Sequence, residues 1–491
     1  MMRQKVVRGG PAGSAVKAER LAPAGRRGTS RAATRVVVQG GVAPRRGSRG
    51  EAERALATAR TRTSALSPFK AGNNPWENLG VGQQGKLGEW YLNIVKGPLR
   101  YVPMILIQVA FIPLLYSYLI FPYLASAGLN VPQMFSTLFA RVFGALPLSP
   151  EVGLAVKSGA SWLLQLPQNA SNELIWRVLL QAVLPLLPVI YFLGVVPLVD
   201  IFMGRFANKR AGNANGGAAA SRPRSQGEDV GEYRVVLWTF SILYATILFM
   251  SAAVAPTLPV VHVLSICLGL GFYGSVLFAV SHELIHSRFR SDRILSKFNL
   301  TLQCYPWYEQ SHKLIHHVRV ATPSDPSSGM KGQSVYGFMA RSVFENIALL
   351  LKMDQISRLT KASWVLGPTL LAGFFLGALG PKALLTFLGA SLVAILMLEI
   401  VQYIEHYGLE RKRLDNGKYE PVTTAHSWNA DWLFTNCHVI NLQLHGDHHL
   451  NAKTPFNELE NKTKGPQLCA PYPVLILLAL VPPLWFWIMD R

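Results

Sequence analysis

Histidines carry the pattern in this sequence that is most suggestive of chemistry. The chain has 12 histidines, and all but one of them follow residue 281. Most fall in four short segments, which read HELIH (282–286), HKLIHH (312–317), IEHYGL (404–409) and HGDHH (445–449). Neutral imidazole is the commonest side-chain ligand of divalent transition metals. These segments therefore predict metal binding.

The spacing within the segments is that of residues on one face of a helix. Residues three or four positions apart are neighbours on a helix surface, so His282 and His286 are predicted to approach the same metal. By the same argument His312 and His316 share a face, while His317 is turned by about 100° and is predicted to reach a different ion. The three rings of HGDHH are predicted to project to one side of a helix and to converge.

Nine histidines are the predicted metal ligands. A zinc site takes four ligands and an octahedral ion takes six, so nine imidazoles exceed the capacity of one ion and predict two. The metal is left open at this point, because imidazole accepts zinc, copper, nickel and iron. The four cysteines form no CxxC pair, so a cysteine-based metal site is not expected. The predicted ligands are His282, His286, His312, His316, His317, His406, His445, His448 and His449.

Four acidic residues lie beside or near these histidines. Two divalent ions held by neutral rings bring about four positive charges, and a ligating histidine usually donates its other N–H to a carboxylate or carbonyl. We therefore predict that the acids support the ligands, with direct metal binding by a carboxylate as the alternative. They are Glu283, Glu399, Glu405 and Asp447.

Three histidines lack the ligand spacing. His262 would lie roughly 30 Å from His282 along one helix, which is the thickness of the bilayer core, so a structural role is predicted. His438 is also predicted to be structural. His426, in AHSWN, is left open as a hydrogen-bond donor that supports the site.

The elements that must position the histidines are long apolar segments. The chain is 50% hydrophobic and 15% charged, and several uncharged stretches reach the roughly 20 residues that cross a bilayer. We predict an all-α polytopic membrane protein with about six transmembrane helices and a histidine-rich di-metal site on one membrane face. Spans are expected near 102–125, 178–199, 235–254, 259–281, 363–380 and 383–404.

Two features complete the predicted topology. Basic residues are concentrated in alternate loops, and the positive-inside rule then places 282–362 and 405–470 on the same membrane face. A last apolar stretch, 471–489, contains three prolines, so a seventh span and an interfacial segment remain alternatives.

The net charge of +21 is concentrated in an N-terminal head. Residues 1–67 hold fifteen Lys and Arg against three acidic residues and have no apolar core, a composition typical of organellar transit peptides. This predicts a chloroplast or mitochondrial membrane; a disordered arm attracted to anionic lipid or nucleic acid is the alternative. No nucleic-acid partner is expected for the rest of the chain.

The chain after the head has two predicted parts. Residues 68–100 are predicted to be a linker with an interfacial segment, and 101–491 the membrane domain.

Five motifs, in this order, resemble the integral-membrane alkane 1-monooxygenase family of the membrane fatty acid desaturase/hydroxylase superfamily. They are HELIH, HHVRVATPSDP, IEHYGL, HSWN and LQLHGDHH, and the resemblance covers roughly residues 100–491. It implies two non-haem iron ions held by the nine histidines and six transmembrane helices. It also implies O₂ and two electrons from a rubredoxin-type or ferredoxin-type donor. The implied reaction hydroxylates the terminal methyl of an alkane or another long alkyl or acyl chain.

Departures from the family pattern surround the ligands without replacing them. The second segment reads SHKLIHH where relatives usually have EHNxGHH, and Leu444 and Gly446 stand where an arginine and a serine are usual. An acyl-lipid desaturase with the same kind of site is the nearest rival. An intramembrane zinc metalloprotease that uses HELIH would leave seven predicted ligands unexplained. A metal transporter or sensor should have polar residues at mid-span, and these spans have almost none.

Overall fold

The computed structural model describes residues 86–105 except Lys96, residue 108, and residues 184–205, 230–461 and 465–490. Within these residues the chain is helical, and β-structure is limited to isolated bridges. The prediction of an all-α protein is therefore confirmed. The basic head and nearly all of the span predicted near 102–125 lie outside the described residues.

The first two long helices form a hairpin. Helix α10 (Val230–Val254) leads through the short η5 (Ala255–Thr257) into α11 (Val260–His286), and Pro259 precedes the first residue of α11. Both helices are long and apolar enough to cross a membrane, which confirms the spans predicted near 235–254 and 259–281. Because α11 continues to His286, HELIH forms the last turn of a membrane helix.

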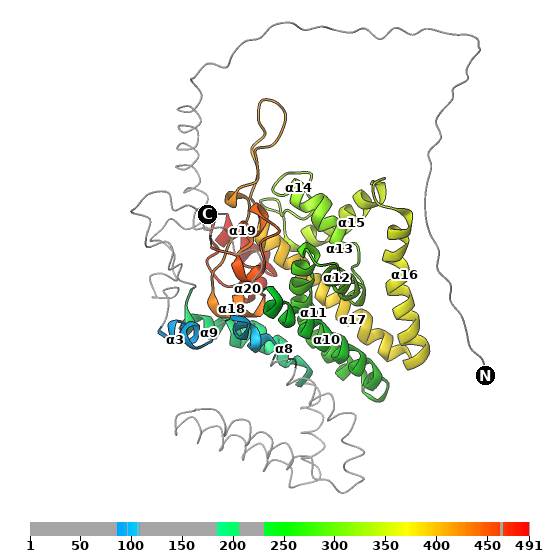
Figure 1. The fold of residues 1–491 in the computed structure, drawn as a ribbon. Coiled ribbons are helices and arrows are strands. Elements are labelled where there is room, and N and C mark those ends of the chain that lie inside the picture. Colours follow the sequence, from blue (N-terminus) through cyan, green and yellow to red (C-terminus); the bar gives the residue numbers. More distant parts are fainter. Residues whose placement is uncertain are drawn as a thin grey trace, which may run out of the picture. The chain divides into compact units, whose positions relative to one another are not determined.

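A second hairpin supplies the other pair of long helices. Helix α16 (Arg358–Phe374) continues as the π-helical η7 (Phe375–Leu379), and α17 (Pro381–His406) follows after one residue. That residue is Gly380, whose φ of 91° is accessible to glycine at little cost. Both segments qualify as membrane spans, as predicted. Figure 1 shows α10, α11 and α17 running in the same oblique direction, while α16 runs more steeply.

The remaining apolar segments are shorter. The described part of the span predicted near 178–199 is a helical stretch, Leu187–Met203, formed by α8 (Leu187–Ile190), the π-helical η3 (Tyr191–Val195) and α9 (Val196–Met203). The stretch 471–489 divides into α20 (Tyr472–Ala479) and α21 (Pro482–Met489). Each of these eight-residue helices is about 12 Å long, well short of the roughly 30 Å core, so this stretch does not cross as a single helix.

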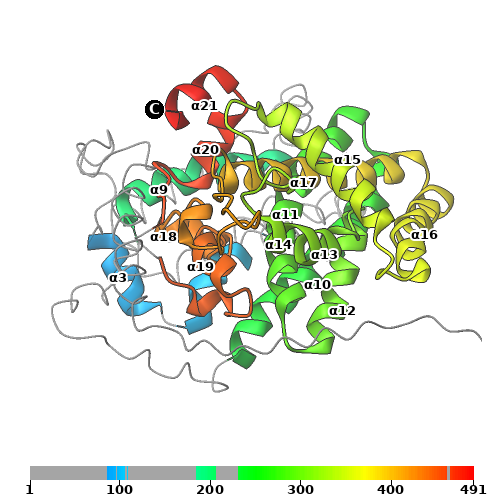
Figure 2. The same cartoon turned by 90° about the horizontal axis from the view of Figure 1, so that it is seen from above.

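Short helices gather around the ends of α11 and α17. Figure 2 shows α13, α14 and α19 grouped around the end of α11. These elements come from two distant parts of the chain, so the end of the bundle brings both parts to one place. The first part contains α12 (Arg290–Leu302), α13 (Tyr308–Ser311), the π-helical η6 (His312–His316), α14 (His317–Arg319) and α15 (Val335–Lys352). The second contains η8 (Thr424–His426), α18 (Leu433–His438), α19 (His445–Leu450) and η9 (Phe456–Glu458). Upstream lie α3 (Lys86–Ile94), η1 (Gly97–Tyr101) and η2 (Leu184–Leu186).

Helices α11 and α17 pack along each other more extensively than any other described pair, and glycines make their close approach possible. A Cβ atom on Gly271 would collide with Val393, and one on Gly274 would lie 2.7 Å from the Cβ of Ala394. Small residues at such contacts let two membrane helices approach closely. This packing fixes the relative position of the two helix ends that carry HELIH and IEHYGL.

We expect Gly271→Val to lower the free energy of unfolding by about 1–3 kcal/mol, because the added side chain must push α17 away. Thermal unfolding of the purified protein in detergent measures this as a lower midpoint. The matched control is Gly373→Val on α16, where a Cβ would meet no other atom within 4 Å. Equal losses of stability in the two variants would contradict the close-packing argument.

Candidate metal centre

The nine predicted ligand histidines gather into two groups beside the ends of α11 and α17. In each group, one nitrogen atom from every ring lies within 4.8 Å of the corresponding nitrogen of every other ring. The three remaining histidines of the chain belong to neither group. The five-histidine group contains His282, His286, His312, His317 and His448, and the four-histidine group contains His316, His406, His445 and His449.

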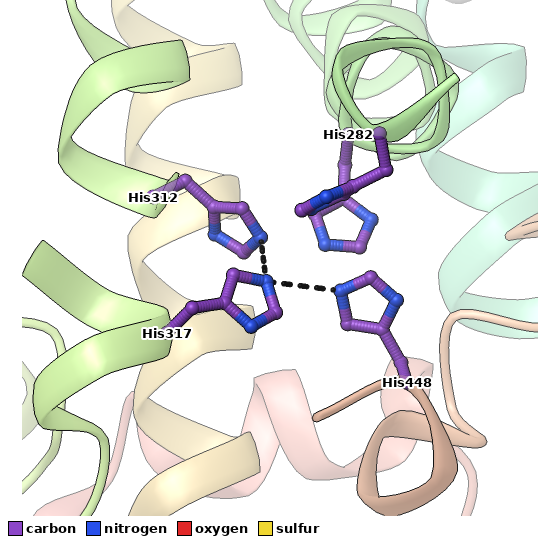
Figure 3. Close-up of side chains that lie close together, drawn as sticks. His282, His312, His317 and His448 are labelled. Atoms are coloured by element: carbon purple, nitrogen blue, oxygen red, sulfur yellow. Dashed lines mark hydrogen bonds between the residues drawn. The ribbon is translucent and has the colours of Figure 1, made fainter. Parts of the chain in front are cut away.

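In the five-histidine group the rings point toward a common centre, as Figure 3 shows for four of them. The Nε2 atom of His317 lies 2.9 Å from that of His312 and 3.2 Å from that of His448. The Nε2 atoms of His282 and His286 are buried and have no hydrogen-bond partner. Leaving a buried polar atom unpaired costs about 1–3 kcal/mol, so these two nitrogens require another partner.

The four-histidine group has the same character. The Nε2 atom of His449 lies 3.0 Å from that of His445 and 3.2 Å from that of His316. The Nε2 atom of His406 is buried without a hydrogen-bond partner.

Both groups fit a bound metal ion. A histidine nitrogen lies about 2.0–2.1 Å from its metal, so adjacent ligands at angles of about 90–110° are roughly 2.9–3.4 Å apart. The measured nitrogen–nitrogen distances of 2.9, 3.0 and 3.2 Å fall in this range. A metal at each centre would also provide the partner that the unpaired Nε2 atoms lack.

Burial keeps the rings in the form that binds metal. It lowers the pKa values of His312, His445, His448 and His449 well below the ordinary value, and the neighbouring histidines lower them further. These four rings are therefore neutral at physiological pH, and each has a nitrogen lone pair available. A set of neutral, converging imidazoles suits a transition metal better than a hard ion such as magnesium or calcium.

In the segment HKLIHH the structure corrects the predicted pairing. His312 and His317 lie in the same group, whereas His316 lies in the other. The cause is the π-helical turn η6, in which the backbone N–H of His317 donates to the carbonyl of His312. A π-helical turn bonds residues five apart, so the α-helical spacing rule does not apply here.

The last segment, HGDHH, also divides between the two groups. His445 and His449, four residues apart, lie in the four-histidine group as neighbours on a helix should. His448 contributes to the five-histidine group, so the prediction that all three rings converge is wrong. Helix α19 is placed so that adjacent positions, about 100° apart around its axis, face different centres.

Of the four predicted supporting acids, Glu405 lies against a ring of the four-histidine group. Its Oε2 atom lies 3.3 Å from Nε2 of His445, and its Oε1 accepts the hydroxyl of Tyr472 at 3.0 Å. The other three acids accept hydrogen bonds from groups outside the nine rings. These are the backbone N–H of Phe456 to Glu283, the backbone N–H of Glu460 to Asp447, and the hydroxyl of Tyr305 to Glu399.

A fifth acid, which the sequence analysis did not select, supports a ligand directly. Asp325 is fully buried, and its Oδ2 lies 2.9 Å from Nδ1 of His316 and accepts the hydroxyl of Ser328 at 2.7 Å. Burial acts to raise the pKa of Asp325, but His316 and Ser328 hold it below its ordinary value. An ionised carboxylate at Nδ1 fixes the tautomer that leaves Nε2 free for metal. Its only sequence signal is its place in HHVRVATPSDP.

The three other histidines have structural surroundings. The backbone carbonyl of His426 lies 3.3 Å from Nδ1 of His406, so this residue supports a ring through its main chain. His438 lies 2.8 Å from the hydroxyl of Tyr191, and His262 is buried outside both groups. These positions agree with the roles predicted for His438 and His262.

A mostly apolar cavity reaches both histidine groups. Among its lining residues are His282 and His312 of one group and His316 and His445 of the other. The polar residues Gln402 and Glu405 also line the cavity. Most of the remaining lining is aliphatic or aromatic, and it comes from α11, α17, α20 and the segment before α19. The cavity has the chemistry expected of a binding site for an apolar molecule.

The sequence of the chain is similar to those of known proteins. Residues 256–476 match the family model described as fatty acid desaturase. The chain is 36% identical over 322 residues to alkane 1-monooxygenase 2 of Pseudomonas aeruginosa, which covers 62% of this chain and 83% of the relative. It is 32% identical over 370 residues to alkane 1-monooxygenase 1 of the same organism, covering 70% and 92%. Alkane 1-monooxygenase 2 of Alcanivorax borkumensis is 32% identical over 318 residues, covering 61% and 80%.

Proposed function

The chain belongs to the alkane 1-monooxygenase family, and on this premise we propose that it hydroxylates the terminal methyl of an alkane or another long alkyl or acyl chain. The observation that carries the proposal is the mostly apolar cavity that opens onto both histidine groups. The four long apolar helices are consistent with an integral membrane protein that takes its substrate from the bilayer.

The proposed cofactor is a pair of non-haem iron ions, one in each histidine group, with the nine histidines as ligands. Bound iron supplies the activation of O₂, for which amino-acid side chains have no equivalent. The protein holds the neutral rings in place, and Asp325 keeps Nε2 of His316 directed into its group.

The cavity contributes binding and exclusion of water. Each CH₂ group moved from water into an apolar wall contributes about 0.8 kcal/mol, so a long chain gains most of its affinity away from the reacting end. The walls provided by Phe278, Ala279 and Leu398 are buried and hold no charge. An alkyl substrate that lies along these walls would present its end to the histidines of both groups.

We propose a rubredoxin-type or ferredoxin-type protein as the donor of the two electrons. The family supports this assignment. Supplying the purified enzyme with reduced rubredoxin or reduced ferredoxin, and measuring product formed per electron consumed, distinguishes the two donors. Failure to form product with either reduced protein would overturn the assignment.

An organellar location is proposed from the composition of residues 1–67 alone. The relatives above are bacterial, so they offer no support for it. A fluorescent fusion of residues 1–100 should reach a chloroplast or mitochondrion. Retention of the fusion in the cytosol would reject the proposal.

The function is tested by metal content and products together. We expect the protein purified from iron-supplemented cells to hold two irons per chain and to convert alkanes or fatty acids to terminal alcohols that contain oxygen from ¹⁸O₂. The match to the desaturase family model favours desaturation as the second candidate. Unsaturated products without added oxygen would establish that candidate instead. One zinc and no iron per chain would overturn both.

We expect Ser275→Phe to shift the preference toward shorter substrates. Ser275 lines the cavity seven residues before His282, on the same face of α11 and about 10 Å along its axis. A phenyl ring there should obstruct long chains and lower kcat/KM for hexadecane relative to octane by roughly tenfold or more. The control is Leu268→Phe on the exposed side of the same helix. If the ratio of kcat/KM for hexadecane to kcat/KM for octane is unchanged in Ser275→Phe, the alkyl chain of the substrate does not pass Ser275.

A further inference from the structure

The two histidine groups offer unequal numbers of ligands. One has five nitrogen donors and the other four, while an octahedral ion accepts six. The four-histidine group therefore has more room for another protein ligand. Glu405 lies at the edge of this group, beside His445, and is only 3% exposed.

We propose that the carboxylate of Glu405 binds the ion held by the four-histidine group and is a tenth protein ligand of the centre. This inference rests on the proposed di-metal function and extends it to one further residue. It gives the two ions different ligand chemistry, with imidazoles alone at one and imidazoles plus a carboxylate at the other.

The side from which Glu405 approaches His445 is the first argument. Its Oε2 lies 3.3 Å from Nε2, the same atom that lies 3.0 Å from Nε2 of His449. A carboxylate that only orients a ligand contacts the opposite ring nitrogen, as Asp325 does at Nδ1 of His316. Glu405 instead lies on the side of the ring that faces the other histidines of the group.

The second argument is charge. Buried carboxylates are unfavourable unless a cation or metal compensates them. Elsewhere in the described residues, Asp292 pairs with Arg234 and Glu309 pairs with Lys313, while the buried Glu399 accepts the hydroxyl of Tyr305. Within the same part of the chain, no lysine or arginine forms an ion pair with Glu405. A divalent ion in the four-histidine group would supply the missing positive charge.

The third argument is the anchoring of the side chain. The hydroxyl of Tyr472 donates to Oε1 of Glu405, which leaves Oε2 directed toward the rings. Tyr472 begins α20 and is 1% exposed, and its backbone N–H donates to the side-chain carbonyl of Gln443. The carboxylate is thus held between the cavity wall and the four-histidine group.

The test compares metal binding in Glu405→Gln with that in Glu399→Gln. Both replace a buried glutamate of α17 with a side chain of the same shape, but Glu399 contacts Tyr305. Iron-loaded proteins are dialysed against a chelator, and iron per chain is followed with time. We expect Glu405→Gln to release one of its two irons at least tenfold faster than wild type, and Glu399→Gln to match wild type. Tyr472→Phe, which keeps the carboxylate and removes its anchor, should give an intermediate rate.

Cobalt(II) provides a readout that a purely structural effect would not change. The visible bands of protein-bound cobalt(II) depend on its ligands, so Glu405→Gln should shift the bands of one of the two ions while Glu399→Gln leaves both unchanged. Wild-type iron release and an unchanged cobalt spectrum in Glu405→Gln would overturn the tenth ligand and leave the di-metal centre intact. A wild-type protein that binds fewer than two ions would overturn the proposed function itself.

Discussion

Replacing His449 with alanine is expected to remove the ion of the four-histidine group and to abolish hydroxylation. The Nε2 atom of His449 faces both His445 and His316 at 3.0 and 3.2 Å, so its loss leaves three histidines in that group. Loss of a residue that merely supports a ligand costs about 10–100-fold in metal affinity or activity. Loss of the ligand itself should exceed this, so we expect product formation to fall by more than roughly 100-fold.

The measurement is iron per chain together with product formation. We expect about one iron per chain in His449→Ala, because the five-histidine group keeps all its donors. The control is His438→Ala, which also removes a buried histidine but one that pairs with Tyr191 outside both groups. It should keep both irons even if its unfolding midpoint falls. Two irons in His449→Ala, or the same loss in His438→Ala, would contradict the assignment of ligands.

The long helices and the gathering of histidines could be predicted because each depends on a short-range pattern. Apolar runs near 235–254 and 383–404 are long enough to cross a bilayer, and the structure forms a helix at each. The spacing of His282 and His286 places both rings in one group, since α11 continues unbroken through them. In these segments the local pattern and the tertiary structure agree.

The division of the rings between the two centres could not be predicted in the same way. Whether His316 or His317 accompanies His312 depends on one π-helical turn, and no glycine or proline in HKLIHH indicates it. Helix α19 divides its histidines for another reason, namely its position relative to two centres whose other ligands come from distant segments. Ring spacing indicates which side chains share a helical face, but not which neighbouring elements that face meets.

The acidic residues show the same limit. Glu399 is seven residues before His406 and so lies on the same face of α17, yet the structure places it against Tyr305. Glu405 is turned by about 100° from His406 and still reaches the four-histidine group, because His445 approaches from another element. Asp325 lies nine residues from His316 in the chain, and the turns between them bring the two together.

We expect Asp325→Asn to weaken the binding of one metal ion by about 10–100-fold. The substitution keeps the size of the side chain but removes the negative charge beside Nδ1 of His316. In the wild-type protein the hydroxyl of Ser328 and the backbone N–H of Ser327 donate to the carboxylate, so the asparagine amide must accept from both groups as well. His316 would then lose the partner that directs its Nε2 toward His449.

Competition with a chelator of known affinity measures this effect, because it reports binding of the weaker ion without reference to activity. Asp292→Asn is the matched control, since Asp292 is also a buried aspartate but its partner is Arg234 and not a histidine of the centre. We expect that variant to lose stability and to retain wild-type metal affinity. Equal metal affinities in Asp325→Asn and wild type would show that His316 is held by its packing alone. A shift of the same size in both variants would show that any loss of stability near the site loosens the metals.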